Sequence, residues 1–131
     1  MLKDKKLVSE NLDEEQERTL NVLLNLFIPP SEDGKIPGAA DVGFLAYIHN
    51  ENIALWIREG LINIIEESHN KYGQEIFSLS GSEQRELIDK LRRKFLQFFN
   101  RLTTHVIQCY YQHDDVIEAI GLEARPPFPQ G

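Results

Sequence analysis

The sequence contains few of the residues and motifs that mark common functional sites. Its 131 residues include one cysteine, Cys109. A single cysteine excludes an internal disulfide and fits a reducing compartment. The cysteine and histidine spacing of zinc sites, a glycine-rich phosphate loop and a nucleophile elbow are all absent. The sequence therefore offers no motif of a known catalytic chemistry.

Long apolar runs and an excess of basic residues are also missing. No stretch approaches the roughly 20 apolar residues that a membrane helix needs. Residues 1–17 are charged, with no apolar stretch of signal-peptide length and no twin arginine, so we expect a cytoplasmic protein without membrane insertion. Fourteen basic against twenty-one acidic residues give a formal charge of −7. This balance disfavours nucleic acid and anionic membranes as partners.

What the sequence does contain is helical periodicity. Hydrophobic residues make up 41% of the chain, which suits a globular domain that buries its own core. We find neither strand alternation nor an internal repeat. The pattern predicts an all-α fold, a compact bundle of four to five helices forming a single domain over 1–131. Residues 1–10 are expected to be a loose lead-in and residues 122–131 an extended, proline-rich tail.

The first predicted helix has clear signals at both ends. Asn11 with Glu14 three residues later has the spacing of a capping box. The helix should end near Ile28, because Pro29 and Pro30 offer no N–H group and the first of them disfavours helical geometry at the residue before it. A polar loop follows.

A second helix is predicted from about residue 38 to residue 49. Its small residues permit close approach of another helix, and we interpret Gly43 as a close-packing position. Val42, Leu45 and Ile48 are expected to face the core.

The third helical pattern covers residues 51–72, with Gly73 as its C-terminal stop. In the connection after it, apolar side chains between residues 74 and 80 are expected to fill the core. Ser80 and Glu83 have the spacing of a second capping box.

Residues 83–112 contain neither glycine nor proline and predict one long helix, with a break near residues 92–94 as the alternative. A short helical turn, Val116–Ile120, should follow and be closed by Gly121. The apolar positions of the long helix step by three and four, as in a buried seam. They are Ile88, Leu91, Phe95, Phe98, Leu102, His105 and Cys109, and the seam is widened by Phe99, Val106 and Tyr110.

Two pairs of side chains have the spacing of a metal-binding or a catalytic pair on one helix. Glu66-x-x-His69 matches half of a di-iron helix motif, but such sites need a second copy, which the chain lacks. His105 and Cys109 lie four residues apart, and we interpret them as a packed thiol beside a hydrogen-bonded core imidazole. We therefore predict no catalytic residue, no metal and no flavin in this chain. A small metal-binding or ligand-binding bundle that uses these four residues is the alternative.

The tyrosine pair Tyr110-Tyr111, followed by residues 113–115, is a third candidate. This aromatic end of the long helix has the composition of a ligand pocket or a partner groove. Nothing in its spacing selects a ligand.

Short motifs in a fixed order also match a known family over residues 12–113. They are Leu20-Asn21, Leu23-Leu24, Ile28-Pro29-Pro30, Pro37-Gly38-Ala39-Ala40, Gly43, Tyr72-Gly73, Phe77, Leu79-Ser80, Glu83-Gln84, Phe98-Phe99, Leu102-Thr103 and Tyr110-Tyr111. With these motifs the chain resembles the gluconate 2-dehydrogenase subunit 3 family. It departs from the family in lacking a twin-arginine export signal and in ending with residues 116–131 in place of a glycine-rich segment.

The resemblance implies a non-catalytic accessory subunit of a membrane-associated, flavin-dependent sugar or sugar-acid dehydrogenase. In that family the large subunit holds the FAD and performs the chemistry, and a cytochrome subunit takes the electrons. The small subunit helps the large one to mature or to be exported, often to the periplasm. It has no known catalytic residues to transfer to this chain.

A partner must bind where the bundle leaves surface free. The candidate partners are a large FAD-dependent dehydrogenase subunit and a second copy of the chain. A proline-rich segment loses little conformational entropy on docking, which favours the loop after the first helix and the C-terminal tail. The predicted partner-binding residues are Pro29, Pro30, Pro37, Arg125, Pro126, Pro127 and Phe128.

Overall fold

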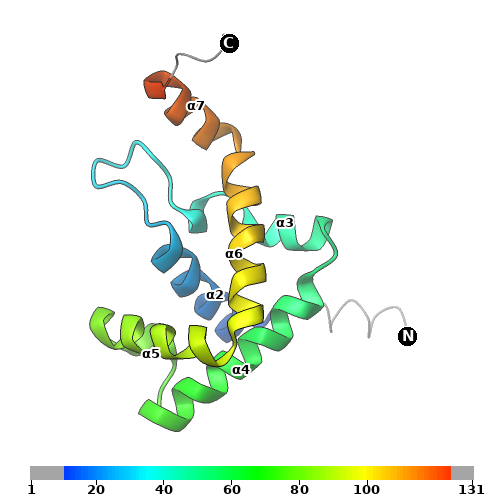
Figure 1. Cartoon of the computed structure of the whole chain (residues 1–131), viewed down its shortest axis with the longest axis vertical. Helices are drawn as coiled ribbons and strands as arrows, with labels where there is room; N and C mark the ends of the chain where they lie inside the picture. The colour runs from blue at the N-terminus through cyan, green and yellow to red at the C-terminus, as the bar shows by residue number, and fades with distance from the viewer. Residues whose placement is uncertain (1–10, 125–131) are drawn as a thin grey trace.

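The computed structural model describes residues 11–124, and over this range the fold is all-α, as predicted (Figure 1). No strand occurs in the described range. The elements, labelled as in Figure 1 with η for short 3₁₀ helices, are α2 (Glu14–Phe27), η1 (Ala39–Asp41), α3 (Phe44–Asn50), α4 (Ala54–Tyr72), η2 (Ile76–Ser78), α5 (Gly81–Lys94), α6 (Leu96–Tyr111) and α7 (Asp114–Ala124).

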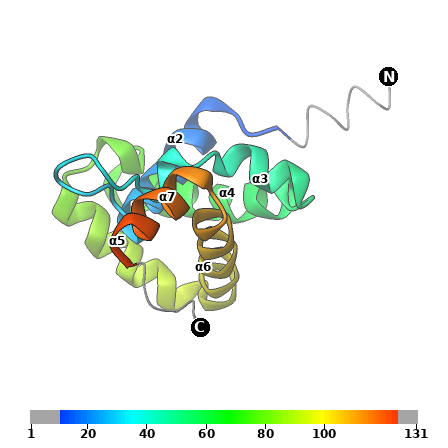
Figure 2. The same cartoon turned by 90° about the horizontal axis from the view of Figure 1, so that it is seen from above.

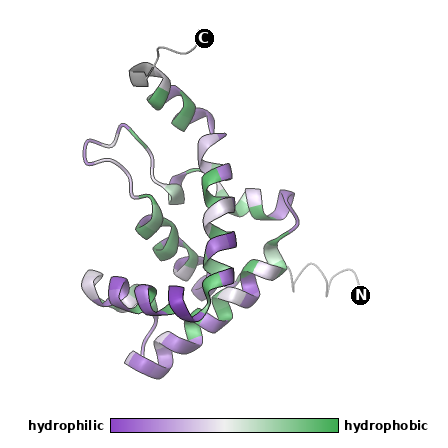
Figure 3. Ribbon diagram, in the orientation of Figure 1, coloured by the Kyte–Doolittle hydropathy of each residue, from purple (hydrophilic) through white to green (hydrophobic). Residues whose placement is uncertain are grey.

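Helix α6 runs lengthwise through the view of Figure 1, and seen from above it lies at one side of the bundle, with α2, α3 and α4 on the same side of it (Figures 1 and 2). It contacts α3, α5 and α7, while α2 packs on α4, η1 and η2. The apolar faces of the helices turn towards one another, and the outer faces of α4 and α5 are largely hydrophilic (Figure 3). None of the helices between residues 11 and 124 is both long enough and apolar enough to cross a membrane.

Helix α2 begins at a capping box two residues later than predicted. The Asp13 carboxylate accepts from the Gln16 backbone N–H at 2.8 Å, and the Gln16 side-chain oxygen accepts from the Asp13 N–H at 2.9 Å. The predicted pair of Asn11 with Glu14 is therefore wrong. Leu12 is buried in the core, so the chain turns inward before the helix starts, and Asp13 becomes the N-cap.

The loop after α2 returns to the point where it leaves the helix. Ile28 caps α2, and its carbonyl accepts from the Ala39 N–H at 2.8 Å. Within the loop, the Ser31 N–H donates to the Ile36 carbonyl at 2.9 Å. Gly38 lies where the two ends of the loop meet, and the closure fixes the backbone beside the end of α2.

The predicted second helix is divided in two at Gly43. The backbone of Gly43 has φ 71°, a left-handed conformation, and Gly43 is the N-cap of α3. A side chain at this position would meet no atom within 4 Å, so the close-packing interpretation of Gly43 is wrong. Val42 and Ile48 are buried as predicted, whereas Leu45 is exposed. The turn at Gly43 rotates the helix away from the face that continuous periodicity predicts.

Helix α4 and the connection after it agree with the sequence prediction. Gly73 ends the helix with φ 71°, and its N–H donates to the His69 carbonyl at 2.9 Å. Ile76 and Leu79 are buried in the core. The capping box at Ser80 is present and starts α5.

The predicted single helix over residues 83–112 is wrong, and the alternative, a break near residues 92–94, is right to within one residue. Phe95 has φ −118° and ψ 52°, ending α5 and beginning α6. The break lets the buried face of α5 and that of α6 both meet the core. It also leaves the cations of residues 92–94 in the last turn of α5, where they complement the helix dipole.

The core face of α6 consists of five residues that all belong to the predicted seam or to the positions that widen it. They are Phe99, Leu102, Val106, Cys109 and Tyr110. Of the predicted seam, Phe95, Phe98 and His105 are only half-buried, because α6 starts in a new register after the break.

Helix α7 is longer than the predicted turn Val116–Ile120. It covers 11 residues and continues through Gly121 to Ala124, so the interpretation of Gly121 as its stop is wrong. An interior glycine weakens a helix by only about 1 kcal/mol relative to alanine, which the other residues of the helix can offset. The first three residues of the predicted extended tail are therefore helical. The remainder, 125–131, and the predicted lead-in, 1–10, lie outside the described residues.

Candidate functional site

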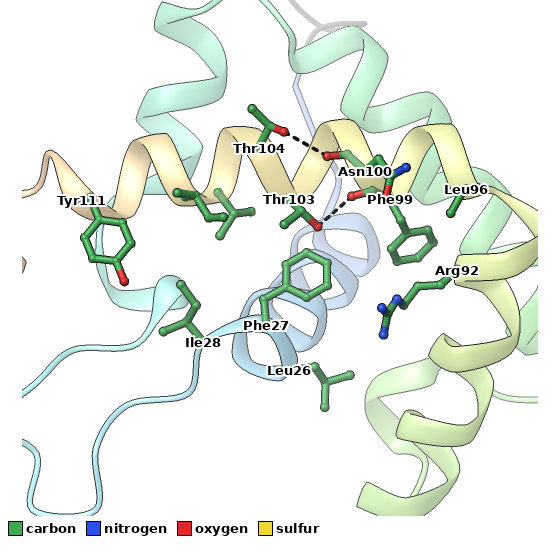
Figure 4. Close-up of a pocket in the computed structure, with 12 residues that line it drawn as sticks. Leu26, Phe27, Ile28, Arg92, Leu96, Phe99, Asn100, Thr103, Thr104 and Tyr111 are labelled. Atoms are coloured by element: carbon green, nitrogen blue, oxygen red, sulfur yellow. Dashed lines mark hydrogen bonds between the residues drawn. The ribbon is translucent and has the colours of Figure 1, made fainter.

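A groove of about 750 Å³ lies between the C-terminal end of α2 and one side of α6 (Figure 4). We call it the α2–α6 groove. Helix α2 contributes Leu26 and Phe27, followed by its cap residue Ile28. Helix α6 lines the other side along its length, and Arg92 of α5 lies at one end.

The groove has an aromatic floor and an apolar rim. The rings of Phe27 and Phe99 meet edge to face with centroids 6.5 Å apart, and Phe99 is buried. Along the rim lie Leu96, Ile107 and Tyr111, whose exposed fractions are 56%, 46% and 55%. Spacings of 11 and 4 residues place these three on one face of α6. The free chain thus leaves a row of large apolar side chains in water.

The polar side chains of the groove are largely committed to their own helices. Thr103 donates its hydroxyl to the Phe99 carbonyl at 2.8 Å, and Thr104 donates to the Asn100 carbonyl at 3.2 Å (Figure 4). The lining contains no carboxylate, imidazole or thiol. Its exposed apolar side chains and its aromatic floor give the groove the character of a binding surface.

The predicted pair Glu66 and His69 lies on α4, but His69 is paired with a residue of another helix. Both side chains are exposed on α4. The imidazole of His69 is directed to Glu15 at the start of α2, with Nε2 2.9 Å from the Glu15 Oε2. His69 therefore contacts Glu15, 54 residues away in the sequence, and the predicted pairing with Glu66 along α4 is not what the structure shows.

His105 and Cys109 make separate contacts instead of forming a catalytic pair. The Cys109 thiol lies 3.7 Å from the Val42 carbonyl oxygen, and its burial raises its pKa. His105 Nδ1 lies 2.8 Å from the Tyr47 hydroxyl, which in turn donates to the Gln108 side-chain oxygen at 2.9 Å. Because the Tyr47 proton is given to Gln108, Nδ1 of a neutral His105 carries the proton and donates to Tyr47.

Burial, and secondly the Arg101 guanidinium, lower the pKa of His105. The neutral imidazole is therefore the favoured form near pH 7. In this form His105 serves as a hydrogen-bond partner that links α6 to α3. This agrees with the predicted hydrogen-bonded role, although the imidazole is only half-buried.

Comparison with known proteins identifies the family. The family described as Gluconate 2-dehydrogenase subunit 3 matches residues 14–123. The chain belongs to this family. A search of the curated proteins and a search of the solved structures each return no match. The family match extends from the first residue of α2 into α7, so it includes every residue of the α2–α6 groove.

The residues predicted to bind a partner have different places in this family member. Pro29 and Pro30 are exposed and directly follow Ile28, which lines the groove. Pro37 is half-buried, and its carbonyl accepts from the Tyr110 hydroxyl at 2.7 Å, so it anchors the loop to α6. The four tail residues of the prediction, Arg125, Pro126, Pro127 and Phe128, lie outside the described residues.

Sequence reasoning found one side of the groove only in part. Tyr111, proposed above as part of a pocket or partner groove, does line it, whereas Tyr110 is a core residue. Leu96 and Ile107 were missed. Neither residue belongs to the predicted seam, but both share one helix face with Tyr111. Apolar residues that repeat on a face away from the seam are the sequence signal for a second apolar face on the helix.

We predict that the Cys109 thiol is unreactive in the folded protein. Its side chain is 5% exposed and burial raises its pKa, so both access and the thiolate fraction are low. Labelling by a chromogenic disulfide reagent at pH 8 should be on the order of 100-fold slower in native buffer than in concentrated urea. Thr104→Cys in a Cys109→Ser background places a thiol on the exposed side of the same helix and should react rapidly. Equal native rates for the two thiols would contradict the prediction.

Proposed function

We propose that the chain is a non-catalytic accessory subunit that binds the large flavoprotein subunit of a gluconate-type dehydrogenase through the α2–α6 groove. The observation that carries the proposal is the row of exposed Leu96, Ile107 and Tyr111 beside an apolar groove. Family membership supports it, because the family is described as a dehydrogenase subunit. In this proposal the chain is located wherever the large subunit is.

Exposed apolar surface of this kind favours association. Burying a large apolar side chain completely contributes about 1.5–3 kcal/mol. The three rim side chains are about half exposed, so each has roughly 1 kcal/mol left to contribute when a partner covers it.

The shape of the groove favours one mode of recognition. It lies between two helices, with an aromatic floor formed by the half-buried Phe27 and the buried Phe99, and with the Arg92 guanidinium at one end. An amphipathic helix of the large subunit fits such a groove by placing one apolar face along α6. Arg92 pairs with Asp89 at 3.7 Å on an exposed surface, where ion pairs contribute little, so it is free to take a partner carboxylate instead.

The proposal assigns no catalytic step to this chain. The groove lining contains no carboxylate, imidazole or thiol, its Thr103 and Thr104 hydroxyls donate to their own helix, and the Cys109 thiol and the His105 imidazole are held in structural contacts. Under this proposal the large subunit binds the flavin and carries out the reaction on the substrate.

Ile107→Glu tests the proposal. We expect it to weaken binding to the large flavoprotein subunit at least about tenfold, since a carboxylate in a desolvated groove leaves an unpaired charge. Ile62→Glu is the matched control, because Ile62 is 40% exposed on α4 and does not line the groove. Affinity is measured by titrating each purified variant onto the isolated large subunit.

Both variants should retain the melting temperature of the parent chain to within a few degrees. Equal affinity of the two variants would remove the groove from the interface. A parent chain that elutes as a dimer, which Ile107→Glu converts to a monomer, would assign the groove to self-association and overturn the proposal.

A further inference from the structure

Three side chains from separate parts of the chain converge at the end of α4. They are Glu15 in the first turn of α2, His69 in the last turn of α4, and Glu75 immediately before η2. One ligand atom from each lies within 4.8 Å of the others, and the closest pair, His69 Nε2 and Glu15 Oε2, is 2.9 Å apart. We propose that this Glu15–His69–Glu75 cluster binds one divalent transition-metal ion.

The donor set selects the class of ion. One imidazole nitrogen with two carboxylate oxygens is a ligand set for Zn²⁺ and related ions, whereas Ca²⁺ and Mg²⁺ prefer oxygen ligands alone. Three protein ligands leave a fourth position for water. Bonds of about 2.1 Å in tetrahedral geometry place ligand atoms roughly 3.4 Å apart. The observed separations reach this value through side-chain movements on the order of 1 Å.

The backbone around the cluster is already held in place. Ser68 is fully buried, and its hydroxyl donates to the Gln74 carbonyl at 2.7 Å. Gly73 closes the end of α4 by donating its N–H to the His69 carbonyl at 2.9 Å. These bonds tie the residues before Glu75 to the helix that carries His69, so two of the three ligands sit on one fixed unit.

The electrostatics of the cluster also favour a cation. Glu15 and Glu75 are both half-buried, and a carboxylate oxygen of one lies within 4.8 Å of a carboxylate oxygen of the other. A divalent ion between the two carboxylates would attract both of them. The ion also joins the first turn of α2 to the end of α4, which makes its role structural.

The proposed site differs from the Glu66-x-x-His69 motif that was considered from the sequence. His69 is a ligand in both, but its partners are Glu15 and Glu75, which lie far from it in the sequence or beyond the helix end, and Glu66 is not one of them. The expectation that the chain binds no metal rested on the missing second Glu-x-x-His motif. The inference is independent of the partner-binding groove, since none of the three ligands lines it.

Calorimetric titration of the full, tag-free chain with Zn²⁺ tests the proposal. We expect one ion per chain, and a Co²⁺ titration should give a visible absorption band that saturates at the same ratio. Glu15→Gln, His69→Gln and Glu75→Gln should each weaken Zn²⁺ binding at least about tenfold, because each removes one of three protein ligands. Glu66→Gln is the matched control and should bind as the parent does.

Three outcomes would overturn the site. They are the absence of stoichiometric Zn²⁺ binding, binding that survives His69→Gln, and a loss in Glu66→Gln as large as that in Glu15→Gln. Circular dichroism of each variant separates ligand loss from misfolding. Glu75 precedes η2 and is no part of an α-helix, so Glu75→Gln keeps the test decisive if a helix variant fails to fold.

Discussion

Replacing Gly38 with alanine is expected to destabilise the protein by about 3 kcal/mol, at the upper end of the range for overpacking. A Cβ atom on Gly38 would lie 2.7 Å from the Pro30 nitrogen and 2.8 Å from the Ile28 carbonyl oxygen. Both are backbone atoms, so no side-chain rotation relieves the contact. The loop must open at its base, and the 2.8 Å hydrogen bond from the Ala39 N–H to the Ile28 carbonyl is lost with it.

Urea-induced unfolding measures this effect, and Gly81→Ala is the control. A Cβ on Gly81 would meet nothing within 4 Å, and Gly81 lies in the first turn of α5, where alanine is tolerated. This variant should be as stable as the parent or more stable by about 0.5 kcal/mol. Similar stabilities for Gly38→Ala and Gly81→Ala would show that the loop has room at its base. Because Ile28 lines the α2–α6 groove, Gly38→Ala should also weaken partner binding under the proposed function.

The two glycines of this region show where sequence reasoning reached its limit. Helical periodicity identified the helix ending near Ile28 and placed a second helix after residue 38. It did not show that Gly43 adopts φ 71° or that Gly38 contacts the backbone of Ile28 and Pro30. A left-handed turn and a close approach of two backbone segments depend on the tertiary structure. Periodicity indicates only which residues share a helix face, so it predicts neither feature. The sequence therefore predicted the helices well but not how they meet.

The same limit applies to the candidate sites. The Glu15–His69–Glu75 cluster draws on three elements, and a search for motifs within one helix finds only Glu66-x-x-His69. The groove depends on the break at Phe95, which sets the rotation of α6 and so decides which of its apolar side chains remain exposed. A continuous helix was the simplest interpretation of a stretch without glycine or proline. In the structure the three cations of residues 92–94 lie in the last turn of α5, where they complement the helix dipole and are a signal for a helix end.

Helix α6 thus has two apolar faces with different roles. One packs in the core through Leu102 and its neighbours, and the other borders the groove through Leu96, Ile107 and Tyr111. This distinction matters for the proposed function, because a core face determines stability whereas a partner face should not. The same substitution made on each face separates the two.

Leu102→Ala is expected to lower the free energy of unfolding by about 3 kcal/mol, and Leu96→Ala to change it by less than about 0.5 kcal/mol. Leu102 is 0% exposed at the centre of the core, so truncation leaves a cavity, whereas Leu96 is 56% exposed in the first turn of the helix. For a chain of this size, 3 kcal/mol corresponds to a fall of roughly 12 °C in the melting temperature. Differential scanning calorimetry measures both variants.

Leu96→Ala and Leu102→Ala should also differ in their affinity for the large flavoprotein subunit. Leu96→Ala removes one apolar rim contact and should weaken binding to the large flavoprotein subunit about fivefold with the fold intact. Leu102→Ala, assayed well below its melting temperature, should bind almost as the parent does, because Leu102 does not line the groove. A large stability loss in Leu96→Ala would mean that this face packs within the chain. The groove would then be part of the core, and the partner would have to bind elsewhere.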